Sequence, residues 1–295
     1  MKMRKIVCSF MISVVCFMTA ISGVSATSYD TSKINAAYSK VVEYYKNNNN
    51  LNNADKILAV ESLGLEAESN QFDTSSADLS STSLSKKIVT EVLLGVDPTE
   101  DKETLESQID ENGNVEGSWG ASSDVWTLYA LYVTSSEKTN LIANKLNDEL
   151  AASSVCGYEW GGTYYADYDT TGWVIEGLAV VNKEKYATTI NKAIDYIKNN
   201  TTMTTTGWVT ADNVDTQSQV LEGMFAYDTN ALLNDSYTVH PVDCLLNTQL
   251  SDGSFPSGYN AEYTTAEVAK TLGTYKNGSV IIKAKKAYDK MMNPE

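Results

Sequence analysis

The sequence is short of the residues from which metal sites and nucleophilic catalysts are usually built. It contains one histidine, His240, and four cysteines among 295 residues. Zinc normally takes three or four Cys, His or carboxylate ligands, and most Ser or Cys nucleophiles need a partner base. His240 and Cys244 are four residues apart on a predicted helix, which is too few ligands for a zinc site. We therefore expect no metal and no cofactor.

Basic residues are also scarce. Lys and Arg number 22 against 38 Asp and Glu, which gives a formal net charge of −16. A strongly acidic chain is repelled by the phosphates of nucleic acids and by anionic membrane surfaces. The charge suits a neutral or cationic ligand, and it also simply keeps a protein in solution. We expect no nucleic-acid partner.

Long apolar runs are missing except at the start of the chain. The basic residues Lys2, Arg4 and Lys5 precede an apolar run at 6–21, and small residues follow up to Ala26. This order is typical of a secretory signal peptide, with cleavage near Ala26. The apolar run is too short to span a membrane comfortably. We therefore expect a secreted protein without a membrane anchor in its mature chain.

Removal of residues 1–26 leaves residues 27–295, enough for one large domain. Cys8 and Cys16 leave with the signal peptide, and Cys156 and Cys244 remain. Two cysteines do not make a disulfide framework, and their spacing does not show whether they form a bridge.

A repeat organises the mature chain. Four similar helix-like segments end at intervals of 46 to 48 residues, two earlier segments share their pattern, and second, ordinary amphipathic helices lie between them. Alternation with a period of two is almost absent, which disfavours strands. The pattern predicts about six helix pairs in one all-α domain, in which each pair buries its apolar face on its neighbours. Four of the segments follow a Gly-rich loop with an aromatic residue: Trp119, Trp160, Trp208 and Phe255.

The aromatic loops, of which the clearest is Gln249-Leu-Ser-Asp-Gly-Ser-Phe255, resemble the repeat of the terpenoid cyclase and protein prenyltransferase superfamily. The chain is most similar to secreted bacterial prenyltransferase or squalene-oxidase repeat proteins. The resemblance covers residues 35–295. It implies an α/α toroid, a ring of inner helices surrounded by outer helices, and it is a poor guide to activity.

Each repeated helix has one apolar face and one polar, aromatic face. The apolar face should pack on the outer helices. Gly177 and Gly223 should let neighbouring inner helices approach closely, and Lys87 and Lys270 should pair with nearby carboxylates. If the polar face looks into the ring, it forms an acidic cleft, although a polar face can also simply contact water. Its residues include Trp126, Tyr129, Trp173, Glu176, Gln219, Glu222, Tyr263, Glu267 and Lys270.

The segment 160–171 contains the pair Asp167 and Asp169. Asp169 recurs as Asp215 one repeat later, which favours a helix cap. Asp167 has no counterpart in this alignment. The order Asp167-Tyr168-Asp169-Thr170-Thr171 resembles the acid motif of class II terpene cyclases, but Thr170 replaces its last aspartate. The nearby loop adds three more candidate ligand contacts, Trp160, Tyr164 and Tyr165.

These observations favour a secreted binding protein with an acidic, aromatic cleft for a polar or cationic small molecule, a glycan or a peptide. Whether it catalyses a reaction stays open. One alternative is a glycan-active or other acid/base enzyme that uses Glu176 and Glu222 as its carboxylates. Another is a cyclase-like enzyme that uses Asp167 and Asp169. The catalytic candidates are therefore Asp167, Asp169, Glu176 and Glu222.

Overall fold

A computed structural model describes residues 29–68, 80–200 and 213–293. The expected signal peptide and Trp208 lie outside these ranges. The described residues are predominantly helical, as predicted, with eleven helices and one two-stranded antiparallel sheet. The elements are α1 (Ser32–Asn47), α2 (Ala54–Ser62), α3 (Ser81–Leu93), α4 (Thr99–Ser107), α5 (Ala121–Val133), α6 (Thr139–Ser153), β1 (Cys156–Trp160), β2 (Thr163–Asp167), α7 (Tyr168–Asn200), α8 (Val214–Asn234), α9 (Pro241–Leu246), α10 (Ala261–Asn277) and α11 (Val280–Met292).

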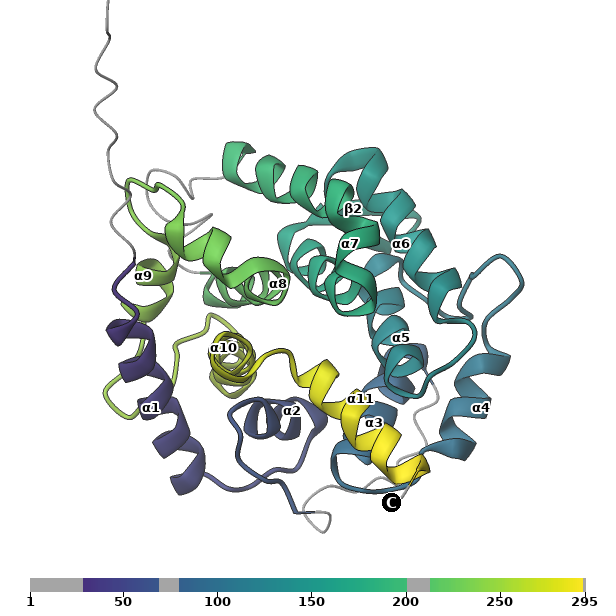
Figure 1. Ribbon diagram of the computed structural model, residues 1–295, viewed down its shortest axis with the longest axis horizontal. Helices are drawn as coiled ribbons and strands as arrows, with labels where there is room; N and C mark the ends of the chain where they lie inside the picture. Colours follow the sequence, from purple (N-terminus) through teal and green to yellow (C-terminus); the bar gives the residue numbers. More distant parts are fainter. Residues whose placement is uncertain (1–28, 69–79, 201–212, 294–295) are drawn as a thin grey trace, which may run out of the picture.

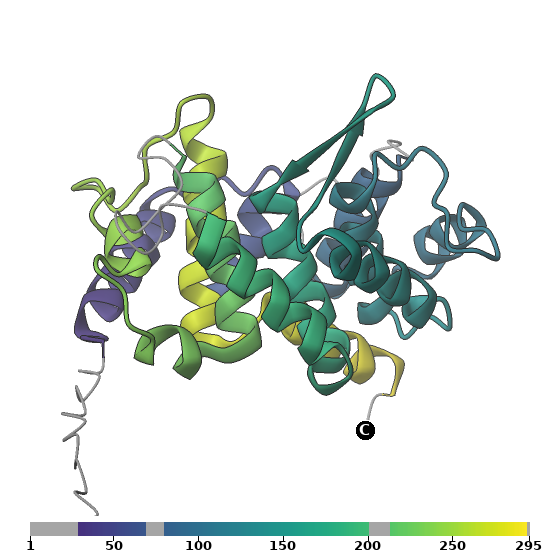
Figure 2. The same cartoon turned by 90° about the horizontal axis from the view of Figure 1, so that it is seen from above.

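Six helices form the centre of the molecule. In the order α2, α3, α5, α7, α8 and α10, each packs on the next, and α10 packs back on α2. Figure 1 shows α1, α9, α6 and α4 outside this group. The hairpin β1–β2 projects from one end of the molecule, and α11 lies toward the other (Figure 2). A central group of helices therefore has one end beside the hairpin and the other beside α11.

The long helices α7 and α8 are each two helices joined at a kink. Asn182 in α7 and Asp228 in α8 have non-helical backbone angles. The Asn182 side chain accepts a hydrogen bond from the Lys185 backbone N–H, and Asp228 accepts one from that of Ala231, both at 3.0 Å. These bonds are helix N-caps, so a new helix begins after each kink. The second half of α7 is one of the amphipathic helices that the sequence predicts between the repeated segments.

The predicted apolar faces are buried. They include Val174, Leu178, Val220, Met224, Val268 and Leu272, each no more than 2% exposed. Full burial of one such side chain stabilises a fold by about 1.5–3 kcal/mol, so this layer makes a large contribution to stability. No helix among the described residues has the length and apolar character needed to cross a membrane.

Glycines set the close contact between α7 and α8. A Cβ atom added to Gly223 would lie 2.3 Å from the Gly172 carbonyl oxygen, and one added to Gly172 would lie 2.5 Å from the Gln219 carbonyl oxygen. The prediction for Gly223 is confirmed, and Gly172 is its partner. The contact at Gly177 is looser, since its nearest neighbour would be a Leu128 methyl group at 3.2 Å.

Candidate functional site

Polar residues of neighbouring central helices meet inside the molecule. The Tyr129 hydroxyl of α5 donates a hydrogen bond to Glu176 Oε2 of α7 at 3.0 Å. The Ser279 hydroxyl, immediately before α11, donates one to Glu176 Oε1 at 2.6 Å. Tyr129 and Glu176 are 1% and 3% exposed. This pair is enclosed by protein.

A second part of the same cluster surrounds Lys270. The Lys270 Nζ atom lies 3.0 Å from Glu267 Oε1 and 4.0 Å from Glu222 Oε2. Gln219 Nε2 donates to Glu267 Oε2 at 3.3 Å, and Thr274 Oγ1 donates to Glu222 Oε1 at 3.3 Å. Glu222, Glu267 and Lys270 are all buried. The expected pairing of Lys270 with carboxylates is confirmed, as is that of Lys87, which lies 2.6 Å from Asp101 and 3.7 Å from Glu91.

Burial controls the electrostatics of this central cluster. Burial raises the pKa of Glu222 well above its ordinary value, and the nearby Glu176 charge raises it further, while Lys270 opposes the shift. Burial also raises the pKa of Glu176, against hydrogen bonds from Ser279 and Tyr129. Burial alone would lower the pKa of Lys270, but the Glu267 and Glu222 carboxylates raise it above its usual value. The lysine is the counterion of the cluster.

Two tryptophans lie between this cluster and the hairpin end. Trp126 is 3% exposed, and its ring lies 5.3 Å from that of Tyr129 and 5.9 Å from that of Trp173. The Lys86 and Lys270 ammonium groups lie 4.5 and 5.4 Å from the centre of a Trp126 ring. Trp126 therefore separates the buried charges from the side chains nearer the surface.

The sequence predicted an acidic cleft lined by these residues, and the structure buries them instead. Tyr129, Glu176, Glu222, Glu267 and Lys270 fill the centre rather than lining an open space, because their polar atoms bond mainly to one another and to residues next to α11. These side chains lie among the central helices, and they are buried there rather than exposed to a cleft. A ligand at the surface does not reach these carboxylates.

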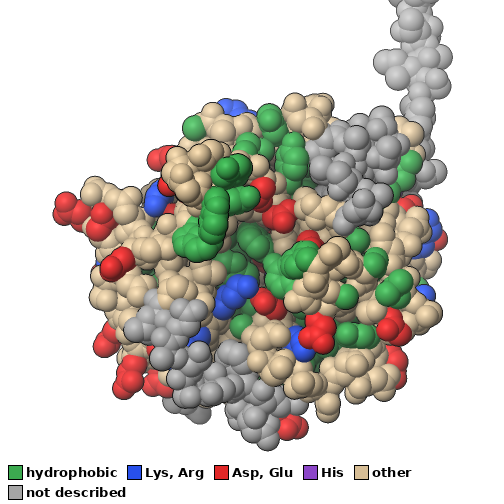
Figure 3. Space-filling model, turned by 180° about the vertical axis from the view of Figure 1, so that it is seen from behind, with side chains coloured by type: hydrophobic (Ala, Val, Ile, Leu, Met, Phe, Trp, Pro, Cys, Tyr) green, Lys and Arg blue, Asp and Glu red, His purple; other side chains and the backbone are tan. Residues whose placement is uncertain are grey.

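Open space lies instead at the hairpin end. A hollow of about 340 Å³ is lined by the starts of α3 and α5, Lys86, Trp119, Trp126 and Trp173. A second hollow of about 470 Å³ is lined by Tyr158, Asp167, Asp169 and residues at the starts of α7 and α8. Both include Ser122 and Trp173, so they adjoin. We call the two hollows together the groove. Figure 3 shows a hollowed face on which hydrophobic, basic and acidic side chains gather.

The hairpin adds aromatic side chains beside the groove. Tyr158 of β1 pairs with Tyr165 of β2, and their rings stack 5.5 Å apart. The rings of Trp119 and Trp160 lie 5.3 Å apart. These four side chains are 36%, 45%, 54% and 61% exposed in the order named. We call them the aromatic wall; Tyr158 and Trp119 also line the groove, one in each hollow.

Two further predicted ligand contacts, Tyr164 and Tyr263, are not in the lining of the groove. Tyr164 points to the other side of the hairpin, where its hydroxyl donates to Glu149 Oε1 at 3.0 Å. Tyr263 is partly buried and accepts a hydrogen bond from Gln219 Nε2 at 3.4 Å. The groove therefore brings together Trp126, Trp173 and Asp167 from the predicted set, with Trp160 and Tyr165 in the wall beside it.

The two aspartates exchange the roles that the sequence suggested. Asp167 immediately precedes α7, and its Oδ1 accepts a hydrogen bond from the Thr170 backbone N–H at 2.7 Å. Asn213 and Asn260 occupy the same position before α8 and α10 and make equivalent bonds. Asp167 is therefore the helix cap, and it does have counterparts, contrary to the sequence alignment. Asp169, in the first turn of α7, is the aspartate without a capping role.

Asp169 lines the larger hollow in an unusual environment. Burial raises its pKa to about 7, against a hydrogen bond from Thr216, and the charges of Asp167, Asp215 and Glu267 raise it further. The protonation of Asp169 therefore changes with pH near neutrality. Near neutral pH, a ligand in this hollow can therefore meet Asp169 in its charged form.

Replacing Asp167 with alanine should lower the free energy of unfolding by about 1 kcal/mol, because the Thr170 N–H loses its partner. Urea denaturation would measure the loss. Asn213→Ala, at the matching cap of α8, should cost a similar amount, whereas Asp167→Asn keeps an acceptor oxygen and should cost less. An Asp167→Ala protein as stable as the parent would contradict the assignment.

Several groove residues were not predicted as ligand contacts. The sequence identifies Trp119 as the aromatic residue of a repeat loop, but it does not show that this side chain is exposed. Tyr158 lies in strand β1, and the Gly161-Gly162 pair that follows this strand, between two aromatic segments, is a hairpin signal. Ser122 and Lys86 carry no comparable signal in the sequence, because their position depends on how separate helices pack.

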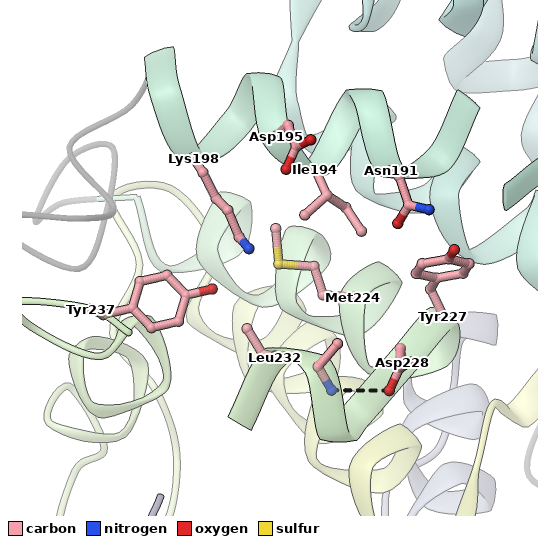
Figure 4. Close-up of a pocket in the computed structure, with 10 residues that line it drawn as sticks. Asn191, Ile194, Asp195, Lys198, Met224, Tyr227, Asp228, Leu232 and Tyr237 are labelled. Carbon is pink, nitrogen blue, oxygen red and sulfur yellow. Dashed lines mark hydrogen bonds between the residues drawn. The ribbon is translucent and has the colours of Figure 1, made fainter. Parts of the chain in front are cut away.

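A smaller hollow lies on the outside, between the second halves of α7 and α8 (Figure 4). Its volume is about 110 Å³, with Ile194, Met224 and Leu232 in its wall, and its Lys198 is already paired with Asp235. Among the described residues, no group of three His, Cys, Asp or Glu side chains could hold a metal, and no disulfide joins Cys156 to Cys244. The groove is larger than this outer hollow, and its lining includes tryptophans, a tyrosine and two aspartates.

Comparison of the chain with known protein families, with curated proteins and with solved structures found no match.

Proposed function

We propose that this chain is a secreted α/α-toroid protein that binds a glycan in the groove. The toroid is supported by the closed order of packing among α2, α3, α5, α7, α8 and α10, and by the repeat that resembles the terpenoid cyclase and prenyltransferase superfamily. Secretion is supported by the signal-like segment at residues 1–26. The groove, rather than the buried centre, is the binding site.

One observation carries the binding proposal: the aromatic wall is continuous with the groove. Trp119 and Tyr158 belong to both, and the wall keeps more than a third of each ring exposed. Exposed aromatic groups that gather on one surface usually mark an interaction site. A ligand could therefore lie in the groove and extend along the hairpin.

The chemistry of these surfaces favours a sugar chain. Sugar rings present flat C–H faces, which suit the faces of Trp and Tyr, and hydroxyl edges, which need hydrogen-bond partners. The groove supplies such partners through the carboxyl groups of Asp167 and Asp169 and the hydroxyl groups of Ser122 and Thr216. Apolar faces with a few placed polar groups are typical of small-molecule sites.

The two enzyme alternatives find less support. Glu176 and Glu222 are enclosed in the central cluster, where a glycan cannot reach them without rearrangement of the helices. Asp169 faces an open hollow with several polar neighbours, whereas protonation of an alkene needs a closed apolar cavity. Neither pair of carboxylates is placed for the chemistry that the sequence suggested.

Titration calorimetry with a panel of oligosaccharides tests the proposal. We expect at least one to bind, and the double variant Trp119→Ala/Trp160→Ala to bind it at least tenfold more weakly, a loss of about 1.4 kcal/mol. Both side chains are more than half exposed, so the fold should tolerate their removal. Tyr227→Ala, in the outer hollow, is the control and should leave affinity unchanged. An equal loss of affinity in the double variant and in Tyr227→Ala would mean that the ligand does not bind at the groove.

A further inference from the structure

One more exposed aromatic side chain stands at the hairpin end of the molecule. Tyr259 lies in the loop before α10 and is 72% exposed, more than any member of the aromatic wall. Helix α10 packs on α8, the start of which lines the larger hollow. Figure 2 shows the chain entering α10 at the same end as the hairpin. Tyr259 therefore neighbours the groove at the side of α8 and α10, whereas the aromatic wall stands at the hairpin.

Tyr259 is bonded to the part of α8 that forms the hollow. Its hydroxyl donates a hydrogen bond to the carboxyl group of Asp215, which is 8% exposed. The next residue, Thr216, lines the larger hollow. Burial of the hydroxyl raises the pKa of Tyr259, and the charges of Asp215, Glu267 and Asp169 raise it further. Asp169, which lines the hollow, is thus within electrostatic reach of the Tyr259 hydroxyl.

The Tyr259 side chain is held in place although its ring is exposed. The bond to Asp215 fixes its outer end. At the backbone, the N–H groups of Tyr259 and Asn260 both donate to the Ser257 hydroxyl oxygen, at 3.2 and 3.1 Å. The Tyr259 ring also contacts that of Tyr263, with the ring centres 6.0 Å apart. A side chain that is already ordered loses little conformational freedom when a ligand binds, which suits a binding role.

The groove thus has aromatic side chains on two sides. Figure 3 shows hydrophobic side chains on both sides of the hollowed centre, with acidic and basic ones between them. The larger hollow, with a volume of about 470 Å³, has Tyr158 of the wall in its lining and is bordered by the α8 turn that holds Tyr259. A ligand that contacts both sides must therefore be an extended one. Successive rings of a sugar chain each present a C–H face that suits an aromatic ring.

We infer that Tyr259 is a second aromatic binding position, and that the ligand is an extended sugar chain which crosses the larger hollow from the aromatic wall to Tyr259. This inference rests on the proposed glycan-binding function and specifies its substrate class as an oligosaccharide rather than a single sugar. The chain would stack on aromatic rings at both sides and meet the polar groups of the hollow between them. A shorter sugar reaches only one side.

Calorimetry with β-1,4-linked oligomers of glucose and of N-acetylglucosamine, from disaccharide to hexasaccharide, tests the inference. In a series that binds, the parent protein should bind the hexasaccharide at least tenfold more tightly than the disaccharide, because only the longer ligand reaches both sides. Tyr259→Ala should bind the hexasaccharide about tenfold more weakly than the parent, because the stacking face is lost. Tyr259→Phe keeps this face and loses only the bond to Asp215, so its affinity should stay within twofold of the parent.

Tyr164→Ala is the matched control. Tyr164 is also an exposed tyrosine whose hydroxyl donates to a carboxylate, that of Glu149, but it points to the other side of the hairpin. This variant should bind the hexasaccharide as the parent does, and circular dichroism should show that all three variants are folded. In the parent labelled with ¹³C-tyrosine, the Tyr259 ring signal, assigned with Tyr259→Phe, should shift on titration with the hexasaccharide. This readout does not depend on the stability of Tyr259→Ala.

Hexasaccharide binding that Tyr259→Ala leaves unchanged would overturn the inference and leave glycan binding in the groove standing. Equal weakening by Tyr259→Ala and Tyr259→Phe would do the same, because it would assign the effect to the bond with Asp215 rather than to the ring face. A disaccharide that binds as tightly as the hexasaccharide would also count against the extended chain alone. If no oligomer of either series binds, both proposals fail.

Discussion

Replacing Lys270 with methionine should lower the free energy of unfolding by about 3–5 kcal/mol. The lysine is the counterion of Glu267 and Glu222 in the central cluster, and all three side chains are buried. Methionine fills a similar volume without the charge, so the loss reports on electrostatics rather than on a cavity. Both carboxylates would remain in a poorly solvated place without their cation, which would destabilise the packing of the helices around them.

Urea denaturation at neutral pH measures this effect. Lys285→Met is the matched control, because Lys285 pairs with Asp289 on the surface of α11 and such a pair contributes at most about 1 kcal/mol. The loss in Lys270→Met should shrink at acidic pH, because Glu222, whose pKa burial raises, is then protonated and no longer needs a counterion. Similar, small losses in both variants would contradict a buried ionic centre.

Replacing Gly223 with alanine should destabilise the protein by about 3 kcal/mol or more. The new methyl group would lie 2.3 Å from the Gly172 carbonyl oxygen and 3.2 Å from Ile175 Cβ. A backbone carbonyl cannot rotate away as a side chain can. The change must therefore separate α7 from α8, and the packing between these helices is among the most extensive in the described structure.

Gly177→Ala is the comparison for this prediction, because Gly177 occupies the same repeat position in α7. Its methyl group would meet the side chains of Leu128 and Val125 at 3.2 and 3.3 Å, and these can shift by the few tenths of an ångström required. Thermal unfolding should show a much smaller loss than for Gly223→Ala. Equal losses would mean that the α7–α8 contact is looser than the structure shows.

The sequence predicted those features that follow from a local residue pattern alone. A period near 3.6 with an apolar face predicted the helices, and Val174, Val220 and Val268 are buried as that face requires. Small residues at a repeated position predicted a close helix contact, and Gly223 makes it. These features depend on local periodicity, which a single sequence displays.

The hairpin was missed although it had a local signal. Gly161 and Gly162 both adopt positive φ angles, +58° and +77°, which suits a tight two-residue turn between antiparallel strands. The repeat pattern placed this segment in a loop before a helix. The helix start was also displaced by two residues, which assigned the cap to Asp169 instead of Asp167. A shift of this size is within the usual uncertainty of helix ends.

The depth of the polar residues could not be predicted from periodicity. A polar helix face looks the same in a sequence whether it contacts water, a ligand or other buried polar groups. Here Ser279 closes the centre by bonding to Glu176, from which it is separated by 103 residues. Lys86, Ser122 and Asp169 meet at the groove for the same reason: the packing of distant helices brings them together.

The indole N–H signals of the tryptophans test the central claim that ligands bind in the groove. The protein would be labelled with ¹⁵N-tryptophan, the signals assigned with single Trp→Phe variants, and spectra recorded during titration with the tightest-binding oligosaccharide. We predict that the Trp119, Trp160 and Trp173 signals shift with one common affinity, because these side chains lie in the aromatic wall and the groove. Binding that leaves all three signals unchanged would contradict the claim.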